Sequence, residues 1–152
     1  MSKVPCLGEI KRIVVAIDLS MEHAKKCIAL AASLARSTGC EIAVLTVIKN
    51  SDIVDSEGKV DHAKLQKAEE EARNLHEELI VRGNMFSFQG AVRSEFKKSD
   101  DVAEAICGYC KKVDADMVIV GRRGVGFLKG VLLGSVSEKV VREAPCAVLI
   151  VK

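Results

Sequence analysis

Alternation between apolar and amphipathic segments is the feature of this 152-residue chain that most limits how it folds. Four short runs rich in Val, Ile, Leu and Ala lack polar alternation, as strands do when both faces of their sheet are covered. They lie at residues 9–17, 42–48, 117–120 and 147–151. Residues 85–92 are a fifth strand candidate, although Phe86, Phe88 and Gly90 follow a period of two only loosely.

The segments between these runs carry apolar residues at helical spacing. Helices are expected from Ser20 to Gly39, near Lys59 to Arg82, from Asp100 and Asp101 to about Val113, and from Ser135 to Ala144. Short strands that alternate with helices predict parallel pairing through crossover connections. The sequence therefore predicts one three-layer α/β domain over residues 1–152, in which four helices cover both faces of a five-stranded parallel sheet.

Composition excludes several classes of protein. The formal net charge is +2, and Phe and Tyr number only 4 and 1, so the chain has neither the charge of a duplex binder nor the rings that stack single strands. No apolar run approaches the ~20 residues of a membrane span, and residues 1–10 lack the apolar region of a signal peptide. The 6 cysteines are scattered within apolar periods. We therefore expect a cytoplasmic protein that binds neither nucleic acid nor membranes.

The ends of the predicted strands locate a candidate site. Ligands of an open parallel sheet bind beyond the carboxyl ends of the strands, where the strand order reverses. The first strand ends at Asp18, the second at residues 47–49 and the fourth at Gly121. These positions are where we expect functional residues.

A glycine-rich loop follows the fourth strand. Five of the 11 glycines lie between Gly121 and Ser135, and the charged residues of the loop are Arg122, Arg123 and Lys129. Glycine amides and a helix N-terminus both bind phosphate. The helix that follows begins Ser135-Val-Ser-Glu138, which predicts a capping box with Ser135 as the N-cap. The loop is therefore either a phosphate site or a solvated loop in which Ser135 only caps the helix.

The loop is neither a Walker A motif nor a Rossmann fingerprint, because Phe127 follows Gly126 and the first strand leads into Asp18-Leu-Ser20. The pattern Gly121-x2-Gly124-x9-Gly134-Ser135, together with Ile13-Val-Val-Ala-Ile-Asp18 and the ending Ala144-Pro-Cys-Ala-Val-Leu-Ile-Val151, resembles the nucleotide-binding branch of the universal stress protein family. The resemblance covers residues 10–152. It implies a Rossmann-like fold with strand order 3-2-1-4-5.

The resemblance also implies which residues bind a nucleotide. Asp18 would lie beside the ribose or adenine, and the backbone of Ala16 and Ile17 would line the pocket. The adenine edge would meet the main chain of Val47, and the ribose would lie between Val120 and Gly121. The phosphates would be held around Arg123, Gly124, Gly134, Ser135 and Val136, with Mg2+ or Mn2+ bound through them.

These residues favour a stress-response protein that binds ATP or AMP and acts as a nucleotide-dependent regulatory or interaction module. Two alternatives remain open. One is a dimeric interaction protein without functional nucleotide binding, which forms a homodimer through the apolar edge strand at residues 147–151. The other is a slow Mg-dependent ATPase, for which the sequence shows no catalytic residues beyond Asp18.

Cysteines and histidines offer weaker signals. Cys107-Gly-Tyr-Cys110 has the spacing of a thioredoxin motif, but it lies inside a predicted helix with Cys110 on the buried stripe, so we expect two structural cysteines. His23, His62 and His76 lie on helices without a metal-binding spacing. They are expected at the surface or at helix caps.

Overall fold

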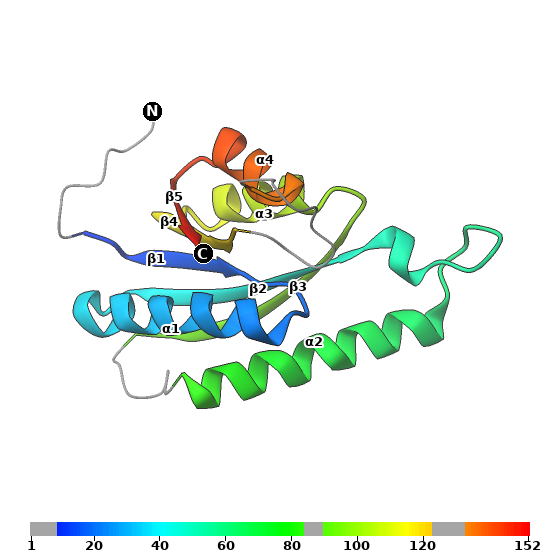
Figure 1. The fold of residues 1–152 in the computed structure, drawn as a ribbon, viewed down its shortest axis with the longest axis horizontal. Helices are drawn as coiled ribbons and strands as arrows, with labels where there is room; N and C mark the ends of the chain where they lie inside the picture. The colour runs from blue at the N-terminus through cyan, green and yellow to red at the C-terminus, as the bar shows by residue number, and fades with distance from the viewer. Residues whose placement is uncertain (1–8, 84–89, 123–132) are drawn as a thin grey trace.

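Five parallel strands form one sheet in the order β3-β2-β1-β4-β5 (Figure 1). The computed structural model describes residues 9–83, 90–122 and 133–152. The strands are β1 (Arg12–Ala16), β2 (Glu41–Lys49), β3 (Val92–Ser99), β4 (Met117–Gly121) and β5 (Ala147–Val151), and the helices are α1 (Met21–Thr38), the 3-10 turn η1 (Asn50–Ile53), α2 (His62–Arg82), α3 (Val102–Lys112) and α4 (Ser135–Glu143). The predicted α/β architecture and strand order are confirmed.

Helices cover the two faces of the sheet in pairs. In Figure 1, α1 and α2 lie below the sheet and α3 and α4 above it. The core on the first face joins α1 and α2 to alternate residues of the sheet, such as Val15 and Val44. The core on the other face joins α3 and α4 to their neighbours along the strands, such as Val14 and Leu45. Both faces of the central strands are therefore buried, which explains their unbroken apolar sequences.

The strand order reverses at β1. This strand pairs in parallel with β2 on one side, where Ala16 faces Leu45, and with β4 on the other, where Ala16 faces Val120. The connections from β1 and from β4 leave the sheet on opposite faces, toward α1 and α4. The carboxyl ends of β1, β2 and β4 consequently open a crevice at this edge of the sheet.

The third strand lies later in the chain than predicted. The sequence pattern placed it at residues 85–92, of which residues 85–89 lie outside the described residues, but β3 spans Val92–Ser99. It pairs with β2 at the edge of the sheet, and its Arg93 and Ser94 side chains are exposed. An edge strand needs apolar residues on one face at most, so this segment has no apolar run to mark it.

The predicted helix starts and stops are largely confirmed by hydrogen bonds. Asp101 caps α3 by accepting a hydrogen bond from the Glu104 amide at 3.0 Å. Gly39 ends α1 in the left-handed conformation, with φ of 70°, which favours glycine. Lys139 of α4 forms an ion pair with Asp101, which raises the pKa of the lysine and lowers that of the carboxyl. This contact fastens α4 to α3.

Candidate functional site

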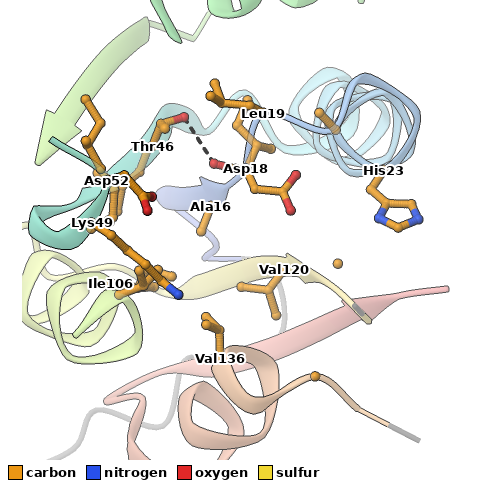
Figure 2. Close-up of a pocket in the computed structure, with 18 of the residues that line it drawn as sticks. Ala16, Asp18, Leu19, His23, Thr46, Lys49, Asp52, Ile106, Val120 and Val136 are labelled. Atoms are coloured by element: carbon orange, nitrogen blue, oxygen red, sulfur yellow. Dashed lines mark hydrogen bonds between the residues drawn. The ribbon is translucent and has the colours of Figure 1, made fainter. Parts of the chain in front are cut away.

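A cavity of about 830 Å3 lies at the carboxyl ends of β1, β2 and β4. Its walls come from these strand ends, from the first turns of α1 and α4, from one side of α2 and from α3. Figure 2 shows side chains from these elements around a common space, with Asp18 and Thr46 in its upper part and Val120 and Val136 in its lower part. The crevice predicted from the strand order is therefore a real pocket.

Most residues predicted to contact a ligand line this cavity. They are Ala16, Ile17, Asp18, Val47, Val120, Gly121, Gly134, Ser135 and Val136. The remaining two, Arg123 and Gly124, lie outside the described residues. The fold thus gathers residues from four separate segments of the chain, although their role as ligand contacts stays a prediction.

The N-terminus of α4 opens into the cavity, because Ser135, Val136 and Ser137 all line it. The predicted capping box is wrong: Gly134 is the N-cap, and its carbonyl accepts the Glu138 amide at 2.9 Å. Among the described residues, no hydrogen-bond acceptor is found for the amides of residues 135–137. Free amides in a first helical turn carry partial positive charge and favour an anion.

Ser137 fixes this helix end to the sheet, and sequence reasoning missed it. The side chain is buried, and its hydroxyl lies 2.7 Å from the Gly121 carbonyl oxygen and 3.2 Å from that of Arg122. The Gly134 amide also donates to the Arg122 carbonyl at 2.9 Å. The two ends of the glycine-rich loop are therefore joined, which holds the first turn of α4 beside the carboxyl end of β4.

Asp18 places a carboxylate at the end of β1. Its Oδ1 accepts a hydrogen bond from the Ser20 amide at 2.8 Å, which makes a tight turn into α1. The side chain is half-buried and lines the cavity. Burial, followed by the negative charge of Asp18, raises the pKa of the nearby Cys27 thiol to about 11. Asp18 therefore supplies the cavity with a fixed acceptor whose Oδ2 faces no hydrogen-bond donor among the described residues.

Two buried polar side chains, Thr46 of β2 and His76 of α2, support the same end of β1. His76 of α2 was expected at a surface or a cap, but it is 0% exposed. Its Nε2 lies 2.7 Å from the Thr46 hydroxyl, which donates to the Ile17 carbonyl at 3.1 Å. Because the hydroxyl gives its one hydrogen to Ile17, His76 must donate from Nε2. The surface prediction is wrong because His76 lies on the same apolar stripe as Ala72, one turn away.

His76 is held as a neutral imidazole. Burial lowers its pKa to about 4, since the charged form would lose its hydration. The ring stacks on Phe96 of β3 with a centroid distance of 4.6 Å. His76 therefore links α2, β2, β3 and the end of β1 through one side chain.

Lysines near the end of β2 add positive charge to the cavity. Lys49, Lys64 and Lys67 line it, and Figure 2 shows the Lys49 side chain extending across the space toward Ile106. The Lys64 ammonium donates to the Val54 carbonyl at 2.8 Å, and Lys67 pairs with Glu71 at 3.9 Å. Lys49 follows Val47 by two residues on the same strand, so period-two spacing was a signal that could have identified it.

Comparison with known proteins connects this geometry to a family. Residues 9–152 match the universal stress protein family. Over 143 residues the chain is 33% identical to the universal stress protein in the QAH/OAS sulfhydrylase 3' region of Thermus aquaticus, and the match covers 93% of this chain and 98% of that protein.

The chain belongs to the universal stress protein family. Universal stress protein MJ0531 of Methanocaldococcus jannaschii is 27% identical over 136 residues, which is 89% of this chain and 76% of that protein. The membership predicted from the glycine spacing and from the first and last strands is therefore confirmed.

Solved structures of other proteins, universal stress proteins among them, share the fold. The hypothetical protein MJ0577 superposes with a TM-score of 0.81 at 26% identity, covering 94% of this chain and 96% of that one. The universal stress protein from Archaeoglobus fulgidus in complex with dAMP has a TM-score of 0.63 at 19% identity, over 93% of this chain and 98% of that one. A universal stress protein in complex with cAMP has a TM-score of 0.59 at 21% identity, over 93% and 96%.

The cavity of this universal stress protein has two chemically different ends. One end offers helix amides and the other an acceptor and strand backbone, with aliphatic side chains between them. Within residues 9–83, 90–122 and 133–152, no three His, Cys, Asp or Glu side chains are grouped to hold a metal ion. In the same ranges, no helix has the length and apolarity needed to cross a bilayer.

Proposed function

We propose that this universal stress protein binds an adenine nucleotide, ATP or AMP, in the cavity at the carboxyl ends of β1, β2 and β4. In the stress response it then acts as a regulatory or interaction module whose state depends on the nucleotide. The observation that carries the proposal is the open N-terminus of α4, which lines the same cavity as Asp18.

The phosphates are expected at α4. The amides of Ser135, Val136 and Ser137 find no acceptor among the described residues, and the helix dipole adds to their attraction for an anion. The hydrogen bonds from Ser137 and Gly134 keep these amides in place before a ligand arrives. Such preorganisation lowers the ordering cost of binding. The predicted phosphate contacts Arg123 and Gly124 lie outside the described residues, and mutation would test them as it would the others.

The base and ribose are expected at the strand ends. Asp18 is suited to a ribose hydroxyl through Oδ2, because its Oδ1 already accepts the Ser20 amide. The side chains of Ala16 and Val120 give an aliphatic floor, and the Val47 backbone gives the adenine edge a hydrogen-bonding partner. The volume of about 830 Å3 lies in the usual range for small-molecule sites. The dAMP and cAMP complexes of structural neighbours support an adenine ligand.

A divalent cation fits this site only through the ligand. No three metal-ligating side chains of the described residues are grouped there, so Mg2+ or Mn2+ would be held by the phosphates. Such an ion would neutralise phosphate charge. The protein's own contribution is to hold the phosphate oxygens with helix amides.

Calorimetric titration of nucleotide-free protein tests the proposal. ATP and AMP should release measurable heat, and GTP should bind more weakly because its base presents a different edge to the Val47 backbone. Asp18→Asn, which keeps the side-chain shape, should weaken ATP binding. Absence of heat with millimolar ATP and with millimolar AMP would contradict the proposal.

A second proposed property is a homodimer formed through β5. This strand pairs with β4 on one side, and in the described part of the chain its other edge has no partner strand. Its residues Val148, Leu149 and Ile150 remain partly exposed in one protomer. An unpaired apolar edge favours pairing with another chain. Sedimentation equilibrium at micromolar protein should show dimers, and a stable monomer would refute this property.

A further inference from the structure

Three cysteines converge at the end of the sheet opposite the nucleotide cavity. Cys107 and Cys110 lie on one face of α3, and Cys146 immediately precedes β5. Cys110 belongs to the core between the sheet and α3, and the other two pack against that core. The amino ends of β4 and β5 lie here, whereas the cavity lies at their carboxyl ends.

Backbone hydrogen bonds fix Cys110 and Cys146 close together. The Ala115 amide donates to the Cys110 carbonyl at 2.9 Å, and the Ala147 amide donates to the Asp116 carbonyl at 3.3 Å. Asp116 is bonded to Ala115 and Ala147 to Cys146, so two short steps connect the two cysteines. The proximity of the two thiols raises the pKa of Cys110 and lowers that of Cys146.

The two thiols differ in access to solvent. Cys110 is 0% exposed, whereas Cys146 is partly exposed. Cys27 and Cys40 are buried on the other face of the sheet, and burial raises the pKa of Cys27 to about 11. A water-borne oxidant therefore meets Cys146 before any of these buried thiols.

We propose that Cys146 is a site of oxidation by hydroperoxides and that Cys110 converts the oxidised form into an intramolecular disulfide. The Cys146 thiolate attacks one oxygen of the peroxide, which breaks the O–O bond, forms a sulfenic acid and releases hydroxide or alkoxide. The Cys110 sulfur then attacks the Cys146 sulfur, so that an S–S bond forms and the S–O bond breaks. The Cys110 proton leaves with the departing oxygen as water, and a thiol reductant reverses the product.

The disulfide would join the C-terminal half of α3 to the start of β5. Both segments already pack in the same core. Cys107 is the natural comparison, because it lies one helical turn from Cys110 and packs on the same core. In contrast to Cys146, its pKa is raised, and burial is the main cause. This site stands independently of nucleotide binding, since no cysteine of the trio lines the cavity.

Peptide mapping of the full-length protein tests the proposal. The reduced protein is treated with one equivalent of hydrogen peroxide, free thiols are alkylated, and tandem mass spectrometry locates the cross-link. A Cys110–Cys146 disulfide within one chain is expected, and it should disappear with dithiothreitol. Cys107→Ser should retain the cross-link. Cys110→Ser should lose it and accumulate a Cys146 sulfenic acid that dimedone traps.

The same peptide mapping can also contradict the assignment of the disulfide to Cys110 and Cys146. A cross-link that uses Cys107 in place of Cys110, a disulfide between two chains, or reduced Cys146 after peroxide treatment would each overturn the assignment. Circular dichroism checks that Cys110→Ser folds. If it does not, the wild-type fragment spectrum still decides which pair is joined.

Discussion

Acid should weaken the fold through His76 in a way that can be isolated from all other groups. Unfolded histidine has a pKa near 6.5, whereas burial lowers that of His76 to about 4. Between these values the unfolded chain binds a proton that the folded chain refuses, so stability falls as the pH falls. A difference of about 2.5 units at ~1.36 kcal/mol each gives a loss of about 3 kcal/mol between pH 7 and pH 4.

His76→Gln removes this term with little change in the local hydrogen bond. The glutamine amide occupies the position of Nε2, so it should still donate to the Thr46 hydroxyl, which now lies 2.7 Å from Nε2. The variant should lose some stability at pH 7 because the ring no longer stacks on Phe96. It should nevertheless lose about 3 kcal/mol less than wild type on acidification.

Urea denaturation at several pH values measures the effect. Carboxylates titrate in both proteins and cancel in the difference between their free energies of unfolding. The free energy of unfolding of wild type minus that of His76→Gln should fall by about 3 kcal/mol between pH 6.5 and 4 and change little below pH 4. His62→Gln is the control, because His62 is exposed at the start of the same helix. Parallel curves for wild type and His76→Gln would refute the buried neutral histidine.

Three further predictions concern the cavity. Ser137→Ala should cost about 1–2 kcal/mol of stability in urea denaturation, because the Ser137 hydroxyl lies 2.7 Å from the Gly121 carbonyl oxygen. Ser135→Ala should cost under ~0.5 kcal/mol, because Ser135 makes no cap, and a larger loss for Ser135→Ala than for Ser137→Ala would support the capping box. Lys49→Met should weaken ATP binding in calorimetry by about two- to fivefold and AMP binding less, because ATP carries more phosphate charge for Lys49 to contact. Lys98→Met, at an exposed lysine, should leave the affinity for both nucleotides unchanged, and equal losses of ATP and AMP affinity in Lys49→Met would contradict a contact between Lys49 and the phosphates. Any slow phosphate release from ATP should fall with Asp18→Asn, and unchanged release would assign the activity elsewhere.

The alternation of buried strands and amphipathic helices was sufficient to predict the architecture, because four strands have unbroken apolar runs. The position of β3 was not predicted in this way, because β3 has no unbroken apolar run. Its register pairs Phe96 with Thr46, but its neighbours Arg93 and Ser94 face solvent at the sheet edge. A polar edge strand has no local signal that separates it from a loop, so its position depends on pairing with β2, which the sequence does not display.

The position of a candidate site residue was predictable where that residue follows or ends a buried strand. Asp18 and Gly121 follow directly from the ends of buried strands. His76 and Ser137 were missed because each is a polar residue that is buried only through a partner far along the chain. Such partners are set by tertiary packing, and a helical pattern alone assigns polar residues to the surface.

Amide chemical shifts test the central claim most directly. A titration of isotope-labelled protein with ATP, followed by 1H–15N NMR, reports both whether the nucleotide binds and where. We expect the largest shifts at the amides of Ser135, Val136 and Ser137 and at Val47, with little change at Cys146 on the far end of the sheet. Saturable shifts confined to another surface, or none at millimolar ATP, would contradict it.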